Sequence, residues 1–194
     1  MRYKEYNVNM VLEKAIDEFW VKGFRGCSVN DLVEKTGVNR FSLYHEFDNK
    51  EGILYASMRL YKERYSNLHH DILLQEGTAK EIIKNFLLRS LTAHKVHQGC
   101  YFIQIGTELA DSDERIKELV DNYLKELEEQ FQAMLLKRGY TLEGASLAAR
   151  HVVGLYCTTM SFCLIHTEEQ RIKHINNGLE IILEKSSSYA KSIK

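Results

Sequence analysis

Residues 28–50 constrain the fold of this chain more than any other segment. Their sequence, SVNDLVEKTGVNRFSLYHEFDNK, divides at Gly37 into two short helical segments. Ser28 and Asn39 stand where the two helices would begin, and both residue types are favourable N-caps. The second segment is too short, and too polar on one side, to serve only as a core element. Two such helices around a glycine turn predict a helix-turn-helix, whose second helix lies in a DNA major groove.

The remainder of the chain is also expected to be helical. None of the 194 residues is proline, which is typical of helical chains because β-rich folds and long loops use proline in their turns. Capping boxes that begin at Thr78 and Thr167 predict two further helix starts. Apolar residues recur at helical spacing, so we predict an all-α fold of about nine helices. An N-terminal three-helix domain is expected over residues 1–48, and a second helical domain over residues 49–194.

The composition is that of an ordinary globular protein, with 44% hydrophobic and 27% charged residues. No apolar run approaches the roughly 18 residues that span a bilayer, and no apolar signal core follows the charged N-terminus. We therefore expect a cytoplasmic protein with no membrane partner. The formal net charge is −1, and residues 1–60 carry nine Lys or Arg against nine Asp or Glu. DNA binding would thus depend on a few placed side chains and not on a basic surface.

A longer pattern surrounds the predicted helix-turn-helix. Its members are Val11, Leu12, Ala15, Phe19, Gly23, Phe24, Ser28, Val29, Asp31, Leu32, Gly37, Val38, Ser42, Leu43, Tyr44, His45, Phe47, Lys50, Glu51, Ile53 and Leu54. This pattern resembles the N-terminal domain of the TetR family of bacterial transcriptional repressors. The resemblance implies that a homodimer binds a quasi-palindromic operator in double-stranded DNA. It also implies that residues 49–194 form an all-helical domain for dimerisation and for binding a small-molecule inducer, whose identity the sequence does not give.

Base contacts are expected from the first turn of the second helix, which comprises Asn39, Arg40, Phe41 and Ser42. In this geometry the start of the recognition helix meets the base edges. Arg40 has the donor geometry for a guanine, and Phe41 is able to touch a thymine methyl group. The family usually has a small residue, often glycine, at position 41 and often alanine at position 33. Phe41 therefore predicts an altered operator preference, and Val33 a small change in the angle between the two helices.

Phosphate contacts are expected from residues around that first turn. Ser28 lies at a helix N-terminus, where backbone N–H groups and the helix dipole favour a phosphate. The resemblance implies that Tyr44, His45 and Lys50 hold phosphates, because they match family positions with that role. The complete set of DNA-binding candidates is Ser28, Asn39, Arg40, Phe41, Ser42, Tyr44, His45 and Lys50.

Two apolar stripes near the C-terminus predict helix–helix packing. The candidate dimer-interface residues on these stripes are Val152, Leu155, Thr159, Phe162, Ile172, Ile175, Leu179 and Ile182. Such stripes also suit the core of a single chain. We favour a dimer of two-fold symmetry, because two recognition helices on two half-sites fix the register on DNA.

Aromatic and polar-tipped side chains between these regions are candidates for a ligand pocket. They are Tyr61, Tyr65, Phe86, His94, Tyr101, Phe102, Gln104, Tyr123 and Tyr156. Apolar walls with a few polar groups are what a small-molecule site requires, although any helical core of this size contains several such residues.

Cys100 is a candidate sensor. Gly99-Cys100-Tyr101, followed by Glu108-Leu109-Ala110-Asp111, resembles a segment in a subset of these regulators, some of which sense electrophiles or oxidants with a cysteine. His94, Lys95 and His97 would lower the pKa of the Cys100 thiol if they lie close to it. A cysteine-based redox repressor is therefore one alternative, and a buried small hydrophobic residue is the other.

Enzyme motifs are missing from the sequence. There is no nucleophile elbow, no phosphate-binding glycine loop and no H-E-x-x-H, so we expect no catalytic residues and no cofactor. The four cysteines lack zinc-type spacing. His94-x-x-His97 and His69-His70-Asp71 have helical spacing for metal ligands but lack a further ligand in pattern, so no metal site is expected. A last alternative is an all-helical interaction module that does not bind DNA, which would leave the polar face of residues 39–45 unexplained.

Overall fold

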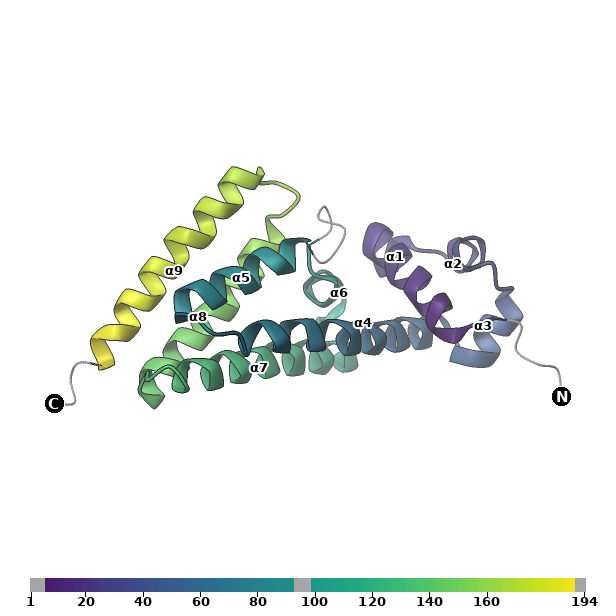
Figure 1. Cartoon of the computed structure of the whole chain (residues 1–194). Helices are drawn as coiled ribbons and strands as arrows, with labels where there is room; N and C mark the ends of the chain where they lie inside the picture. Colours follow the sequence, from purple (N-terminus) through teal and green to yellow (C-terminus); the bar gives the residue numbers. More distant parts are fainter. Residues whose placement is uncertain (1–5, 93–98, 191–194) are drawn as a thin grey trace. The chain divides into compact units, whose positions relative to one another are not determined.

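A computed structural model describes residues 6–92 and 99–190, with no side-chain description for residues 65–70 and 185–190. All regular secondary structure in these residues is helical (Figure 1), which confirms the predicted all-α class. The helices are α1 (Val8–Gly26), α2 (Val29–Thr36), α3 (Arg40–Phe47), α4 (Lys50–Leu73), α5 (Ala79–Thr92), α6 (Tyr101–Leu109), α7 (Glu114–Leu136), α8 (Leu142–Ser161) and α9 (Glu168–Ala190).

Local side-chain caps explain why the first helices begin where they do. The side chain of Asn7 accepts from two backbone N–H groups of α1, and Ser28 and Asn39 do the same for one N–H each in α2 and α3. Gly37 ends α2 with a φ of 77°, a left-handed conformation that glycine adopts without steric cost. The caps and the turn that the sequence predicted are therefore confirmed.

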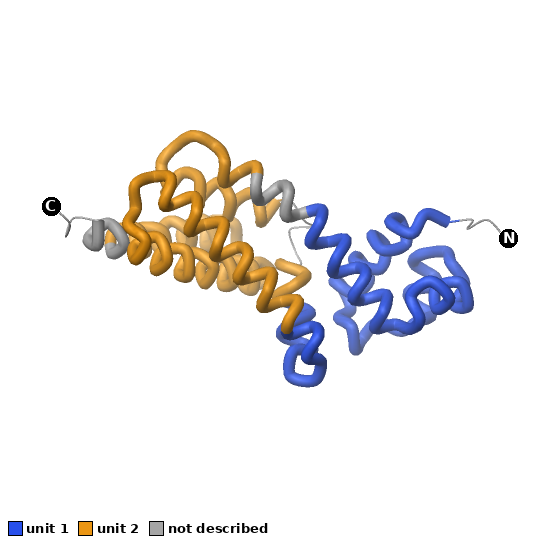
Figure 2. The backbone as a smooth tube through the Cα atoms, turned by 90° about the horizontal axis from the view of Figure 1, so that it is seen from below, with its two compact units in different colours: residues 1–66, 104–117 blue, residues 67–103, 118–194 orange. Residues whose placement is uncertain are grey.

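The chain forms two compact units, coloured separately in Figure 2. Unit 1 comprises Met1–Ser66 together with Gln104–Lys117, and unit 2 comprises Asn67–Ile103 together with Glu118–Lys194. The domain boundary predicted after residue 48 falls inside unit 1. Most of α6 and the start of α7 belong with the N-terminal helices, although they lie far from those helices in sequence.

The core of unit 1 joins α1 to α2, and α2 to α3. Its fully buried side chains include Ala15, Phe19, Leu32, Leu43, Ile53 and Leu54. Each large apolar side chain that is buried in this way contributes about 1.5–3 kcal/mol relative to exposure. This core fixes the two short helices of the predicted helix-turn-helix.

The core of unit 2 is aromatic. Phe86 makes edge-on ring contacts with Phe131, at a centroid distance of 4.9 Å, and with Tyr156, at 5.8 Å. Phe102 stacks on Tyr123 at 4.5 Å. The α8 and α9 helices pack along each other beside this cluster, so unit 2 is held by ring packing and by one long helix pair.

Candidate nucleic-acid interface

The α3 helix presents a continuous exposed face. Arg40, Phe41 and His45 are exposed, and Phe41 is 80% exposed although it is a large apolar residue. The Arg40 guanidinium lies over the ring of Tyr44, 5.3 Å from its centroid, and the Phe41 ring lies 6.3 Å from that of His45. These two pairs at i,i+4 spacing order the side chains along the face. The arrangement is compatible with the predicted recognition helix, whose first turn would meet base edges.

The opposite face of α3 holds the helix in place. Leu43 is fully buried and Phe47 is nearly so. The Asn39 side chain accepts a hydrogen bond from Ser42 N (2.9 Å), and the Ser42 carbonyl accepts one from the hydroxyl of Tyr6 (3.2 Å). Asn39 and Ser42 therefore have structural partners in the helix start in addition to their predicted contacts with bases.

The junction between α3 and α4 depends on Gly52, a residue that the sequence patterns did not single out. A Cβ atom at this position would lie 1.8 Å from the carbonyl oxygen of Phe47. The Gly52 N–H also donates to the side chain of Asn49 (2.7 Å), which caps α4. The two helices thus approach so closely that only glycine fits, and this approach places Lys50 beside the recognition helix.

The phosphate candidates differ in how they are held. The Lys50 ammonium lies 4.2 Å from the ring centroid of Phe24, so an aromatic platform orients it. Tyr44 is half-buried under Arg40 and His45 is exposed. All three lie in unit 1 with the recognition helix.

Ser28 is held by an internal carboxylate. Its N–H and its hydroxyl both donate to Asp31 Oδ2, at 2.7 and 2.5 Å, in a capping box. Lys22 Nζ lies 2.7 Å from Asp31 Oδ1. The hydrogen bond from Lys22 holds the pKa of Asp31 well below its usual range, and the hydrogen bonds from Ser28 act in the same direction. This carboxyl is therefore charged. A phosphate at Ser28 would therefore compete with Asp31, a feature that the sequence prediction did not include.

Comparison with known proteins agrees with this geometry. Residues 11–56 match the model of the bacterial regulatory proteins of the tetR family. The uncharacterized HTH-type transcriptional regulator YezE of Bacillus subtilis is 27% identical over 70% of this chain and 72% of its own length. The HTH-type transcriptional repressor ComR of Escherichia coli is 30% identical over 56% of this chain and 54% of its own.

The fold agrees as well. A cysteine mutant of the TetR-family regulator CifR, solved with double-strand operator DNA, superposes with a TM-score of 0.80 at 19% identity, over 93% of this chain and 98% of its own. Residues 11–56 therefore match the DNA-binding domain of the tetR family, and the chain has the fold of TetR-family regulators. The family resemblance of the sequence is therefore confirmed, together with its helix-turn-helix domain.

The structure divides the ligand-pocket candidates between the two units. Tyr61 and Gln104 lie in unit 1. Tyr61 packs edge-on against Trp20, and Gln104 Nε2 donates to the Trp20 carbonyl (2.8 Å). The side chain of Tyr65 and all of His94 lie outside the described residues. Tyr61 and Gln104 thus have partners in the DNA-binding unit.

The remaining five pocket candidates form the closed aromatic core of unit 2. Phe86, Tyr101, Phe102, Tyr123 and Tyr156 are each at most 4% exposed. The hydroxyls of Tyr123 and Tyr156 are hydrogen-bonded to each other (3.1 Å), and burial raises the pKa of Tyr123 well above its ordinary value. The Tyr123 and Tyr156 hydroxyls are partners of each other, and the assignment of a ligand to these five residues stays a prediction.

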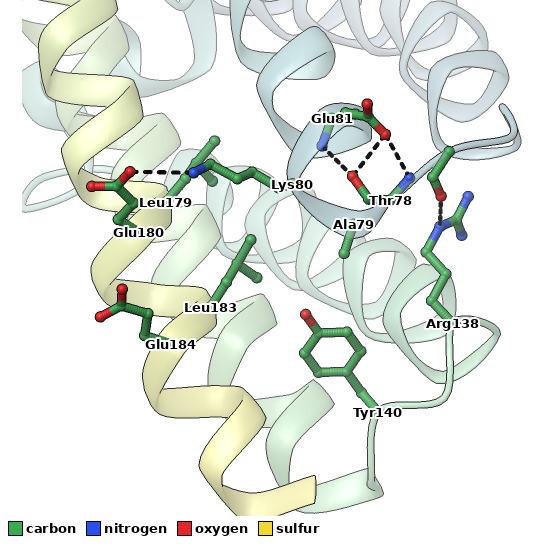
Figure 3. A pocket seen from close by; sticks show the side chains of 11 residues that line it. Thr78, Ala79, Lys80, Glu81, Arg138, Tyr140, Leu179, Glu180, Leu183 and Glu184 are labelled. Carbon is green, nitrogen blue, oxygen red and sulfur yellow. Dashed lines mark hydrogen bonds and ion pairs between the residues drawn. The ribbon is translucent and has the colours of Figure 1, made fainter.

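Figure 3 shows a groove elsewhere in unit 2, with a volume of about 820 Å³. It is lined by residues 77–81 at the start of α5, by Arg138 and Tyr140, and by Leu179, Glu180, Leu183 and Glu184 of α9. Lys80 pairs with Glu180 (3.3 Å), and Arg138 Nε donates to the Gly77 carbonyl (3.1 Å). None of the seven predicted pocket residues whose side chains the structure describes lines this groove, and its rim charges are bound to protein partners.

The predicted dimer-interface residues separate into two groups. Val152, Leu155, Thr159, Ile175 and Leu179 are buried within a single chain, where α8 packs on α9. Phe162, Ile172 and Ile182 keep accessible surface. The stripes therefore describe largely the seam between α8 and α9 of one protomer, and the five buried residues have little surface left for a second copy.

The cysteines of this regulator are free thiols in buried or half-buried places. Cys100 is 3% exposed and lies beside Tyr123. Burial raises the pKa of the Cys27 and Cys157 thiols to about 11, and it raises that of Cys163 as well. His94, Lys95 and His97, which were expected to activate Cys100, lie outside the described residues. The burial of Cys100 does not favour the redox alternative, because a reactive cysteine is usually partly exposed.

Two further observations concern binding classes. Within residues 6–92 and 99–190, no three His, Cys, Asp or Glu side chains come together as a metal site would require. Among the same residues, no helix combines the length and the apolar character needed to cross a membrane.

Proposed function

We propose that this TetR-family regulator is a homodimeric, non-enzymatic repressor. It binds a quasi-palindromic operator in double-stranded DNA in the cytoplasm, and a small molecule releases it. The observation that carries this proposal is the exposed face of α3, with Arg40, Phe41 and His45 open to solvent on a helix that is capped and buried on its other side. The operator complex of CifR and the repressor ComR support the same role.

Selection of duplexes from a random pool tests this function directly. We expect an enriched sequence with two related half-sites whose centres lie about one helical turn or a multiple of it apart, because each protomer places one α3 helix in a major groove. The complex should contain two or a multiple of two protomers per duplex. A pool that shows no enrichment over many rounds would favour the helical interaction module without DNA binding.

The dimer would use the accessible face of α8 and α9. Gly154 is exposed on α8, and a Cβ atom there would meet nothing within 4 Å. Phe162, Ile165 and Ile181 are large apolar residues exposed on or beside these helices. A glycine among apolar side chains lets a second helix approach closely, so this face suits a four-helix bundle between two copies.

Substitution of Gly154 tests the dimer. Gly154→Arg should leave the protomer folded, since the position is open and arginine favours a helix more than glycine does. Sedimentation should then give a monomer with weak operator binding. Ala133→Arg, at an exposed position on α7, is the matched control and should remain dimeric. Dimeric Gly154→Arg would place the interface elsewhere.

Release by an inducer requires that the ligand bind one conformation more tightly than the other. We place the inducer in unit 2, at the aromatic cluster around Tyr123 and Tyr156. A ligand that enters this cluster must replace the hydrogen bond between their hydroxyls, so a planar molecule with a hydrogen-bonding group fits best. A compound that raises the thermal midpoint of the protein and lowers its operator affinity would identify it.

A further inference from the structure

The α1 helix is interrupted close to the start of the helix-turn-helix. Gly23 has φ 71° and ψ 169°, after which one more turn runs to Gly26. In a continuous helix the N–H of Phe24 would donate to the carbonyl of Trp20. An interruption separates such donors from their acceptors, and buried backbone groups then require other partners.

The α6 helix supplies partners for both sides of the interruption. Gln104 Nε2 donates to the Trp20 carbonyl (2.8 Å). The Glu108 carboxylate accepts from the N–H of Phe24 (2.8 Å) and from the N–H of Arg25 (2.6 Å). Gln104 and Glu108 are four residues apart, so they lie on one face of α6. Side chains from residues more than 80 positions away in sequence thus replace the missing helical bonds.

The geometry leaves little freedom at this contact. A Cβ atom on Gly23 would lie 2.9 Å from Glu108 Oε2, and the left-handed φ of Gly23 independently favours glycine. The Arg25 guanidinium also donates to the hydroxyl of Ser112 (3.2 Å), at the turn that follows α6. Two backbone N–H groups on one carboxylate form charge-assisted hydrogen bonds, which are shorter and stronger than neutral ones.

The residues held by Glu108 lead directly to the DNA-binding candidates. Phe24, whose N–H binds Glu108, is the ring over which the Lys50 ammonium lies at 4.2 Å. Phe24 also packs against Phe19 of the unit 1 core, at a ring distance of 5.8 Å. Three residues after Arg25, the chain reaches Ser28, which caps α2. A shift of this short turn would therefore move the platform under Lys50 and the start of α2 together.

We propose that Glu108, assisted by Gln104, is a positioning residue for DNA binding. Its carboxylate fixes the turn at Phe24 and Arg25, and the turn orients the Lys50 ammonium toward a phosphate. Glu108 itself does not contact DNA in this assignment. The inference rests on the proposed function, because it gives a role to Lys50 in that function. It adds a residue of α6 to the side chains that support a binding surface built from residues 28–50.

Glu108→Gln is the variant that tests this role. It keeps the size of the side chain but replaces one carboxylate oxygen with an NH2 group, which donates and cannot accept, so only one of the two backbone N–H groups keeps its acceptor. We expect operator affinity to fall about tenfold, as for loss of a charge-assisted hydrogen bond. The slope of log affinity against log salt should also fall by about one, as for loss of one phosphate contact. The variant is compared with Lys50→Met and with the Glu108→Gln/Lys50→Met double variant.

A residue that serves only the fold would not change the slope of log affinity against log salt, so this slope separates the two roles. If Glu108 acts through Lys50, the double variant should bind no more weakly than Lys50→Met alone, within about twofold. Glu114→Gln is the control, since Glu114 is an exposed residue of the same region that pairs with Lys117 one turn away. It should match the wild type in affinity and in slope.

Five outcomes decide the proposal. Weaker binding, a reduced slope and non-additivity with Lys50→Met support it. Unchanged operator binding by Glu108→Gln overturns it, as does weaker binding with the wild-type slope. Loss of the folded state in both Glu108→Gln and Glu108→Asp, measured by circular dichroism, also overturns it, because the residue would then serve folding alone. If the wild type itself prefers no duplex over random DNA, the proposed function fails, and this inference fails with it for a different and recognisable reason.

Discussion

The two units use their polar and aromatic side chains in opposite ways. In unit 1, Arg40, Phe41 and His45 stand in solvent on a helix whose other face is buried. In unit 2, Tyr123 and Tyr156 are buried and bind each other. Side chains that are exposed and ordered are available to an external partner, whereas a buried, satisfied pair must first be opened. Under the proposed function, the contrast favours a preformed surface for DNA, whereas a ligand that binds at Tyr123 and Tyr156 would have to rearrange the core.

The largest effect is expected from a substitution at the junction between α3 and α4, which holds the exposed face of α3 in place. Gly52→Ala should lower the free energy of unfolding by about 3 kcal/mol or more, because a backbone oxygen occupies the place of the new Cβ. Operator binding should be lost as a consequence. Thermal unfolding followed by circular dichroism measures the first effect. Gly26→Ala is the control, since its Cβ would lie 3.9 Å from the Lys22 side chain and should be tolerated.

The next largest effect concerns the phosphate contacts. Tyr44→Ala and Lys50→Ala should each weaken binding about tenfold to the selected operator and to unrelated duplexes alike, because phosphates carry no sequence information. Fluorescence anisotropy at two salt concentrations measures both affinities. Loss confined to the operator would instead give these residues a role in contacting bases.

A test at Phe41 isolates one predicted contact of the exposed α3 face, that between its ring and a thymine methyl group. If its ring touches a thymine methyl, replacing that thymine with deoxyuridine should weaken binding by about 1 kcal/mol, which is roughly fivefold. Phe41→Ala should bind the two duplexes equally. A deoxyuridine scan that leaves wild-type binding unchanged at every thymine would remove Phe41 from direct contact with bases.

Substitutions in the aromatic core of unit 2 should lower the stability of the protein and leave its affinity for DNA nearly unchanged. Tyr123→Phe and Tyr156→Phe each remove a hydroxyl from a buried pair and should lower the free energy of unfolding by about 1 kcal/mol. Operator affinity without ligand should stay within about twofold of the wild type. A tenfold change in that affinity would mean that the aromatic core already controls DNA binding in the absence of a ligand.

The smallest effect is expected at the thiols. Burial raises the pKa of Cys27 and Cys157 to about 11, so near pH 8 only about 0.1% of either thiol is ionised. Alkylation by iodoacetamide should be slow, and should accelerate about tenfold per pH unit below that pKa. Mass spectrometry of the modified protein measures these rates. Rapid alkylation of Cys100 at neutral pH, with loss of operator binding, would revive the redox alternative.

The sequence predicted unit 1 well because its signals are local. Ser28, Gly37 and Asn39 act on the backbone within a few residues, and each acts as expected in the structure. The contact between Gly23 and Glu108 joins residues far apart in sequence, and neither spacing nor composition reveals it. The same holds for Gly52, whose necessity follows only from the close approach of two helices.

Unit 2 was harder to predict for a related reason. The stripe that includes Val152 and Leu155 has the spacing of a helix interface, and it forms one. Periodicity does not tell whether the partner helix belongs to the same chain or to a second copy. Aromatic content likewise did not distinguish Tyr61, which packs in unit 1, from Tyr123 in the core of unit 2.

The central claim is that the exposed face of α3 selects the operator. Its most direct test is the ratio of affinities for the selected operator and for a random duplex, measured for the wild type and for Arg40→Ala at equal salt. The wild type should prefer the operator by about a thousandfold or more. Arg40→Ala should lose roughly tenfold to a hundredfold of that preference while keeping its affinity for random DNA within a few fold. An equal ratio for the two proteins would contradict the claim.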